Sequence, residues 1–421
     1  MHLKGGKVSR PLELLTKDEI YSIHASALDI LENIGVIFED KSALVILGES
    51  GCEVNSKTGL VRFPEKLVEE VMKKAPSSVT LCGRTSDYDL KMEDCRTYFA
   101  GGANALKIVD SDTFDARDAT VKDFVNLTII SDALENVHCY LPIVWPQDVP
   151  PIGVDRVKCE NALMNTLKHY FADAEGRKGA EDQVKMAEAV TGGEVELRKR
   201  PILSLAPCIT SPLCWGSNAL GVLSVMAEKS LPQIISSEPE SGATSPVTLA
   251  GSLVQQNAEI LSGVVLSQLI NPGAPVLSCT LPSLMDMRSA NIACGTVELG
   301  LMCAAMAQIY RQYRIPYVGT GGIADSKIPD EQAAYEKALS ALIPAQAGSN
   351  LIHLASGMLE SILATSYEQI VIDNEILGMV LRAARGIEVT PETLAIDTIK
   401  KVGPRGHFLA QKHTMKYLKE E

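Results

Sequence analysis

The chain has 421 residues, of which 46% are hydrophobic and 22% are charged, a composition typical of a packed globular protein and not of a disordered one. Its 39 Lys and Arg residues against 52 Asp and Glu residues give a net charge of −13, which argues against binding to nucleic acid or to an anionic membrane surface. The longest apolar run, Ile260–Ile270, is shorter than the ~20 residues needed to cross a bilayer.

Two further features predict a cytoplasmic protein without a metal centre. The first residues, Met1–Gly6, lack the apolar stretch of a secretory signal. The ten cysteines are scattered along the chain and form no Cys-x-x-Cys pair. We therefore expect reduced, buried thiols, and neither a disulfide framework nor a bound metal.

The N-terminal part of the chain predicts a small mixed α/β cap over residues 1–110. Thr16–Glu19 has the pattern of an N-cap and acidic first turn, followed by apolar residues at helical spacing. Helices and then short strands are expected in this order: Ile20–Ile34, Lys41–Ser50, Pro64–Ala75, Ser78–Cys82, Thr97–Ala100 and Leu106–Val109.

Residues 111–421 show a different rhythm, in which short β-forming runs alternate with longer helical patterns. The strands are expected at Val137–Trp145, His169–Ala172, Ile202–Ala206, Gln233–Ser236, Pro275–Cys279, Pro316–Gly319 and Asn350–Leu354. The helices are expected at Asp155–Thr166, Ala180–Val190, Gly216–Lys229, Leu249–Leu269, Cys294–Tyr313, Asp330–Ala347 and Glu368–Arg385. This alternation predicts parallel strands joined by helical crossovers.

Seven such strands, with an eighth expected near Leu106 or missed by the pattern, predict a (β/α)8 TIM-type barrel with a C-terminal helical extension. An open doubly wound sheet is the alternative. It usually carries a Gly-x-Gly-x-x-Gly turn, and neither Gly101–Gly102 nor Gly319–Gly322 has that spacing before a helix.

In a barrel, the chemistry lies at the carboxyl ends of the strands. Aromatic rings are expected there at Tyr98, Trp145 and Tyr317, with Tyr335 one turn into the following helix. Ring faces bind a quaternary ammonium by cation–π attraction. The alternative for each ring is simple packing in the core.

Two titratable residues are the other candidates. His353 closes the last predicted strand, where it would orient a substrate or transfer a proton; the alternative is a core histidine bonded to a backbone carbonyl. Glu238 follows the strand Gln233–Ser236 and would counter a cation, or else lie in an exposed loop.

Several segments, in order and over nearly the whole chain, resemble the trimethylamine methyltransferase family. They are Asp29–Val36, Ser245–Gly251, Asp286–Arg288, Gly321–Gly322, Asp325–Lys327, Gln332–Glu336, Ala355–Glu360, Arg385–Glu388 and Gly403–Leu409. The resemblance implies a (β/α)8 barrel that moves a methyl group from a methylated amine to the Co(I) of a corrinoid carried by a separate cognate protein.

The trimethylamine branch of this family contains pyrrolysine, whereas this sequence has standard residues throughout. The resemblance therefore points to the branch that uses quaternary amines such as betaines or carnitine, and His353 resembles a pocket histidine of that branch. An Arg is expected shortly after the Pro-Tyr of glycine betaine relatives, but Val318 and Gly319 stand here. A carboxylate clamp is then missing or supplied elsewhere.

The resulting prediction is a corrinoid-dependent, homo-oligomeric methyltransferase acting on a quaternary amine. One alternative is a barrel that binds a quaternary-amine osmolyte without catalysis, and another is a trimethylamine-type methyltransferase. A barrel lyase or aldolase is disfavoured, because no predicted strand ends in a Lys that could form a Schiff base.

Overall fold

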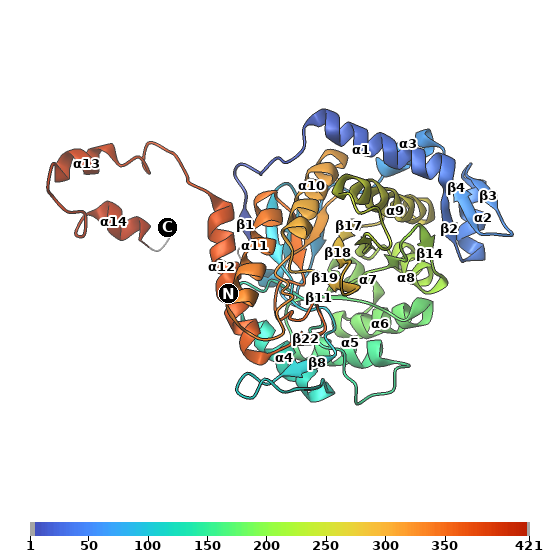
Figure 1. Ribbon diagram of the computed structural model, residues 1–421, viewed down its shortest axis with the longest axis horizontal. Helices are drawn as coiled ribbons and strands as arrows, with labels where there is room; N and C mark the ends of the chain where they lie inside the picture. Colours follow the sequence, from blue (N-terminus) through green and yellow to red (C-terminus); the bar gives the residue numbers. More distant parts are fainter. Residues whose placement is uncertain (1–4, 419–421) are drawn as a thin grey trace. The chain divides into compact units, whose positions relative to one another are not determined.

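The computed structural model describes residues 5–418. Residues 1–4, on which the prediction of no secretory signal partly depends, and residues 419–421 lie outside the described part. The chain divides into two compact units, Met1–Ala384 and Arg385–Glu421 (Figure 1). The second unit contains α13 (Ile396–Val402) and α14 (Lys412–Tyr417), and neither helix has a buried residue.

A ten-stranded sheet organises the first unit. Its main path is β1 (Gly6–Lys7), β7 (Arg96–Phe99), β21 (Leu351–His353), β20 (Tyr317–Thr320), β17 (Val276–Thr280), β15 (Gln233–Ser237), β12 (Leu203–Leu205), β11 (His169–Ala172) and β10 (Cys139–Tyr140), and β13 (Cys208–Ile209) pairs with β15. All these pairings are parallel except that of β1 with β7. A parallel bridge between Ala100 and Cys139 connects β10 to the residue after β7, so the sheet curls back on itself.

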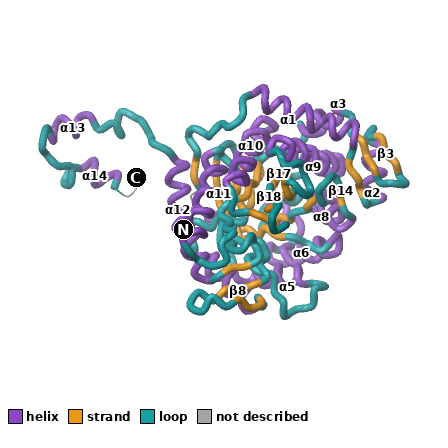
Figure 2. Tube along the Cα trace, viewed as in Figure 1, coloured by secondary structure: helices purple, strands orange, loops and turns teal. Residues whose placement is uncertain are grey.

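Helices follow the strands along the chain and give a mixed α/β fold (Figure 2). They are α4 (Val121–Ala133), α5 (Val154–Asn165), α6 (Gly176–Thr191), α7 (Glu194–Lys199), α8 (Ser217–Glu228), α9 (Leu249–Ile270), α10 (Val297–Tyr313), α11 (Glu331–Gln346) and α12 (Tyr367–Arg385). The alternation of parallel strands and helices predicted from the sequence is confirmed, and β11 has the predicted bounds.

Two strand predictions need correction. The run Val137–Trp145 contributes only the short strand β10, since Pro142 within it has no N–H to donate to a sheet. The additional parallel strand is β7 and not the segment near Leu106, whose strand β8 (Lys107–Val109) pairs with β22 (Ala364–Thr365) and β9 (Ala116–Asp118) in a separate small sheet.

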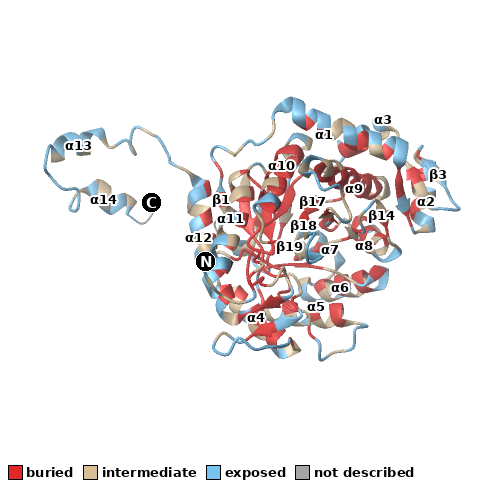
Figure 3. Ribbon diagram, in the orientation of Figure 1, coloured by how far each residue is buried: buried red, intermediate tan, exposed pale blue. Residues whose placement is uncertain are grey.

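The N-terminal elements pack on the outside of α9. They include α1 (Lys17–Asp29), the π-helix η1 (Ile30–Ile34), α2 (Lys41–Glu49) and α3 (Glu65–Met72). Helix α1 begins at the predicted N-cap, where Thr16 and Glu19 form a capping box. Helices α1, α2 and α3 contact α9, which also contacts β15 and β17 of the sheet. Because α9 is covered on both sides, it is buried around most of its circumference (Figure 3).

Short strands complete the first unit. One small sheet has the order β14 (Cys214–Trp215), β2 (Val36–Phe38), β4 (Leu60–Arg62) and β3 (Glu53–Asn55). The others join β5 (Val79–Leu81) to β6 (Leu90–Met92), and β16 (Glu240–Ser241) to β18 (Ser283–Asp286) and β19 (Asn291–Ala293). The 3-10 helix η2 spans Ser86–Tyr88. Over the described residues, every helix is too short or too polar to span a bilayer.

Candidate active site

A cavity of about 260 Å³ lies at the carboxyl ends of the sheet strands. Its wall includes residues at the ends of β11, β15, β17 and β21 and in the loops that follow them. Apolar side chains such as Leu141, Leu281 and Leu354 alternate there with a few polar ones. A concave, mainly apolar space with few polar groups is typical of a small-molecule site, and this edge of a parallel sheet is where such sites occur.

His353 forms part of the cavity wall, where it is buried and uncharged. It ends β21, is 4% exposed, and its ring centroid lies 6.1 Å from that of Phe171. Its Nε2 lies 2.6 Å from Thr320 Oγ1 and 3.5 Å from Cys279 Sγ. Burial lowers the pKa of His353 to about 4, because an imidazolium would lose its hydration there. The ring is therefore uncharged at neutral pH.

Glu238 supplies a carboxylate to the same cavity. It follows β15, and its Oε1 accepts a hydrogen bond from the Ser236 hydroxyl at 2.9 Å. The side chain is exposed to solvent within the cavity but is surrounded by protein atoms. This enclosure raises the pKa of Glu238, and the hydrogen bond from Ser236 partly offsets the rise. A cation bound beside Glu238 would stabilise its ionised form.

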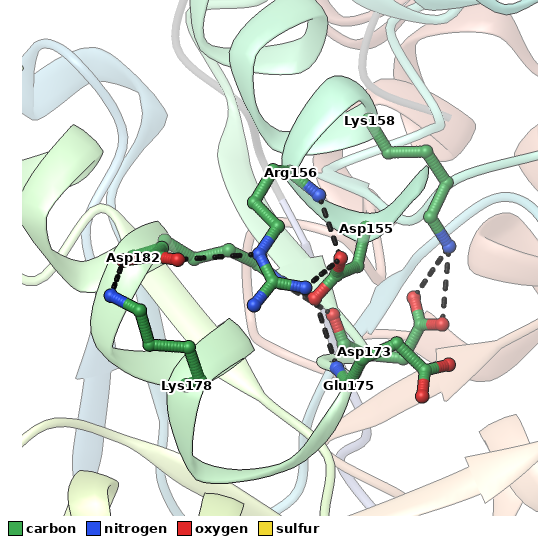
Figure 4. A network of polar contacts seen from close by, with 8 residues as sticks. Asp155, Arg156, Lys158, Asp173, Glu175, Lys178 and Asp182 are labelled. Carbon is green, nitrogen blue, oxygen red and sulfur yellow. Dashed lines mark hydrogen bonds and ion pairs between the residues drawn. The ribbon is translucent and has the colours of Figure 1, made fainter. Parts of the chain in front are cut away.

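A second carboxylate in the wall, that of Asp173, is already paired. Lys158 on α5 donates to both Asp173 oxygens, at 2.7 and 3.1 Å, and to Asn104 Oδ1 at 2.8 Å (Figure 4). The Lys158 ammonium also lies 4.2 Å from the centroid of the Trp145 ring. Its side chain is 0% exposed. Lys158 therefore neutralises Asp173 and is itself closed off from the cavity.

An adjacent ionic network fastens the loop that carries Asp173. The Glu175 N–H donates to Asp155 Oδ2 at 2.9 Å, and Arg156 donates to Asp155 Oδ1 at 2.9 Å and to Asp182 Oδ2 at 3.4 Å (Figure 4). Asp182 also accepts from Lys178 at 2.6 Å. These contacts connect α5 and α6 to the end of β11, so the position of Asp173 is set by two helices.

The structure brings Glu238 and His353 together, but not the four rings predicted from the strand ends. Trp145 lies against the Lys158 ammonium, and Tyr98 is buried edge-on to His138 with ring centroids 5.5 Å apart. Tyr317 stacks on Tyr310 of α10 at 5.8 Å, and therefore faces the helix layer. Tyr335 is 62% exposed on α11.

Phe171, Asp173 and Asn104 line the cavity but were not selected from the sequence as site residues. Phe171 and Asp173 lie at the end of a correctly predicted strand, and that position was the available signal. Asn104 follows the Gly101–Gly102 pair and has a φ of 58°, a left-handed conformation that Asn tolerates better than most residues. The sequence pattern does not place β7 among the parallel strands, so it gives no reason to expect a site residue in the loop that follows β7.

The cavity also contains thiols that are unsuited to nucleophilic chemistry. Burial raises the pKa of Cys208 and of Cys279 well above the ordinary value for a thiol, so both remain protonated at neutral pH. Among residues 5–418, no group of three or more His, Cys, Asp or Glu side chains is arranged to hold a metal ion.

Comparison with known proteins places this geometry in a family. The family model described as trimethylamine methyltransferase (MTTB) matches residues 6–421. The chain belongs to this family. The trimethylamine methyltransferase MttB of Desulfitobacterium hafniense is 40% identical over 96% of this chain and 81% of that protein. The MttB protein of Methanosarcina barkeri is 38% identical, over 96% of this chain and 82% of that protein.

Another relative in the family is named for a different substrate. The glycine betaine methyltransferase of Desulfitobacterium hafniense is 36% identical, over 99% of this chain and 86% of that protein. Among solved structures, the monomethylamine methyltransferase MtmB of Methanosarcina barkeri aligns with a TM-score of 0.51 and 13% identity, covering 91% of this chain and 83% of that one. This likeness supports the mixed α/β, barrel-like fold.

Proposed function

We propose that this family member transfers a methyl group from a quaternary amine to the Co(I) of a corrinoid carried by a separate protein. In this proposal the curled sheet works as a closed (β/α)8 barrel, and the N-terminal segment works as a cap. The observation that carries the proposal is the Glu238 carboxylate, which faces a cavity of about 260 Å³ without a cationic side chain opposite it. Methyltransferase activity among the relatives supports it.

The role of the cavity is to hold a cation with one N-methyl group toward the open side. Glu238 attracts the positive charge, and the attraction is strengthened because the surrounding atoms lower the local dielectric. The apolar wall, including Phe171 and Leu281, packs against methyl groups and excludes water from the reacting carbon. Fixing the orientation of the N–CH3 bond removes part of the entropic cost of the transfer.

The neutral state of His353 suits a quaternary substrate. A quaternary nitrogen leaves as an uncharged amine, so no acid is required to protonate it and no base is required to prepare it. His353 and its partner Thr320 therefore shape the wall and orient the ammonium. The corrinoid, when docked, supplies the cobalt nucleophile. The protonated thiols Cys208 and Cys279 do not compete with it for the methyl group.

The test combines the purified chain, a reduced corrinoid protein or free cob(I)alamin, and a panel of quaternary amines and trimethylamine. We expect the absorbance of methylated corrinoid to appear with a quaternary amine, together with an equal amount of demethylated amine measured by mass spectrometry. Calorimetric binding without methyl transfer to any corrinoid would instead support a non-catalytic binding protein. Methylation from trimethylamine alone would contradict the quaternary-amine assignment.

A further inference from the structure

The ionisable groups around the cavity leave one carboxyl group, that of Glu238, without a cationic partner. Asp173 is neutralised by Lys158, whose ammonium lies 2.7 Å from it. His353 is buried and hydrogen-bonded through Nε2 to Thr320, and it carries no charge at neutral pH. The Glu238 carboxylate is hydrogen-bonded by the Ser236 hydroxyl and the Cys208 thiol, and both of these groups are neutral. A ligand of net charge +1 would balance this cavity, whereas a zwitterion would not.

The Lys158 ammonium bonds two residues of the cavity wall, Asn104 and Asp173, but it cannot pair with a carboxylate of the substrate. The Lys158 side chain is 0% exposed, and its ammonium is enclosed by Asn104, Asp173 and the Trp145 ring. Among the described residues, no Lys or Arg side chain lines the cavity. The position after the Pro-Tyr pair is occupied by Val318, which is buried in the apolar core.

A carboxylate in this cavity would meet repulsion. Glu238 lines the wall, and Asp173 beside it already has Lys158 as its partner, so an anionic tail would approach the Glu238 oxygens without a cationic side chain to pair with. Burying an unpaired charge is costly, and like charges at close range in a low dielectric increase that cost. The cavity volume of about 260 Å³ also lies below the range of roughly 300–1,000 Å³ typical of drug-sized ligands, which favours a compact head group.

We propose that the substrate is a compact quaternary ammonium without a carboxylate, of the tetramethylammonium or choline type, and that Glu238 selects it against betaines. This inference rests on the proposed function and narrows it: the family resemblance alone suggested a betaine or carnitine. Glu238 acts by pairing with the ammonium, so a ligand of the same shape without the charge does not bind.

The experiment measures binding to the full chain by calorimetry, without corrinoid. The probes are tetramethylammonium, choline, glycine betaine and 3,3-dimethylbutanol, which is the uncharged carbon analogue of choline. We expect choline or tetramethylammonium to bind at least tenfold more tightly than glycine betaine and 3,3-dimethylbutanol. Glycine betaine binding as tightly as choline would overturn the inference. Equal affinities for choline and 3,3-dimethylbutanol would also overturn the inference.

Variants of two nearby carboxylates test the role of Glu238. Glu238→Gln should weaken choline binding at least tenfold, and Glu238→Asp, which keeps the charge, should restore part of the affinity. Glu175→Gln is the matched control, because Glu175 is exposed two residues beyond Asp173 and does not line the cavity. Its affinity should remain that of the unmodified chain. Unchanged affinity in a folded Glu238→Gln variant, with folding checked by thermal melting, would exclude the proposed pairing.

The two experiments distinguish a failure of this inference from a failure of the proposed function. Methyl transfer from glycine betaine but not from choline would leave the proposed function standing and overturn this narrower inference. If cations bind selectively but no corrinoid is methylated, the proposed function fails while the charge selectivity of the cavity remains.

Discussion

Thr320 and His353 are directly paired across neighbouring strands, and the pairing fixes the tautomer of the imidazole. The Thr320 hydroxyl donates its proton to the Thr280 carbonyl oxygen at 2.6 Å, and its oxygen lies 2.6 Å from His353 Nε2. Since the hydroxyl has a single proton, Nε2 must carry a hydrogen and donate to Thr320. The other ring nitrogen, Nδ1, is then unprotonated and remains an acceptor.

Replacing Thr320 by Val should remove the contact that fixes the tautomer and orientation of the His353 ring. The variant loses the acceptor for His353 Nε2–H and the donor for the Thr280 carbonyl, so we expect a loss of about 1–3 kcal/mol in the free energy of unfolding. The ¹⁵N chemical shifts of His353 should change from one tautomer to a mixture. Methyl transfer should fall about tenfold, on the order of the 1.4 kcal/mol expected for one misplaced wall residue.

Thr365→Val is the matched control for this change. Thr365 is also fully buried, but its hydroxyl has no hydrogen-bond partner among the described residues. Removing an unsatisfied buried hydroxyl should leave the free energy of unfolding unchanged or raise it. Equal losses in the two variants would show that the Thr320–His353 pairing has no special value.

Gly322, in the loop after β20, should not tolerate a side chain. Its φ is +80°, and a Cβ there would lie 2.7 Å from both the Cα and the carbonyl oxygen of Ala355. The left-handed conformation alone costs a residue with a side chain about 1–2 kcal/mol. We therefore expect Gly322→Ala to lower the free energy of unfolding by more than this amount. Gly273→Ala provides the comparison, since Gly273 has a φ of +88° with no atom within 4 Å of its Cβ position. Chemical denaturation measures both, and equal costs would contradict the packing argument.

The buried pair Lys337–Asp373 should hold two loops at the carboxyl edge of the sheet. The two charged atoms are 3.1 Å apart, and both side chains are 1% exposed. Lys337 also donates to the Gly322 carbonyl at 2.9 Å, and Asp373 accepts from the Gly357 N–H at 2.6 Å. Lys337→Met leaves a buried carboxylate without its partner, so we expect a loss of about 3–5 kcal/mol in the free energy of unfolding.

The double variant Lys337→Met with Asp373→Leu should recover most of that loss, because replacing both charges removes the unpaired group. The exposed pair Arg198–Glu194, with side chains 51% and 48% exposed, is the surface control. Arg198→Met should change the free energy of unfolding by less than about 1 kcal/mol. A small effect of Lys337→Met, similar to that of Arg198→Met, would refute the assignment.

The sequence predicted the alternation of strands and helices, because β-forming runs such as that of β11 and long helical patterns are local signals. Glu238 and His353 were also recoverable, since each closes or directly follows a strand. The sequence could not show whether the predicted tyrosines face the cavity. Successive residues of a strand face opposite sides, and Tyr317 faces α10 while Thr320, three residues later, reaches His353 inside the sheet.

The charge balance of the cavity cannot be predicted from the sequence, because it too depends on contacts between separate parts of the chain. Lys158 lies on a helix 15 residues before Asp173, and nothing in the local pattern connects the two. Their pairing arises from the packing of α5 against the end of β11. Likewise, strand β7 falls in a segment rich in short strands, and only long-range pairing with β21 distinguishes it. Non-local contacts therefore decide which polar groups are free to act.

The buried histidines should make the protein less stable as the pH falls below about 6.5. His169 is fully buried, with Nδ1 3.0 Å from the Cys82 carbonyl oxygen and Nε2 2.9 Å from Ser204 Oγ. Burial lowers the pKa of His169 to about 4, against about 6.5 in an unfolded chain. Between these values the unfolded chain binds a proton that the folded chain does not, so stability decreases as the pH falls and becomes independent of this residue below about 4.

His169→Gln should flatten this dependence, because Gln does not titrate. Measured by denaturation between pH 7 and pH 4, the unmodified chain should lose about 3 kcal/mol more than the variant, from 1.36 kcal/mol per pKa unit. The variant will begin from a lower stability at pH 7, so the slopes and not the absolute values are compared. His407→Gln, at an exposed position, should follow the unmodified chain. Parallel curves for His169→Gln and the unmodified chain would mean that His169 does not stay neutral on folding.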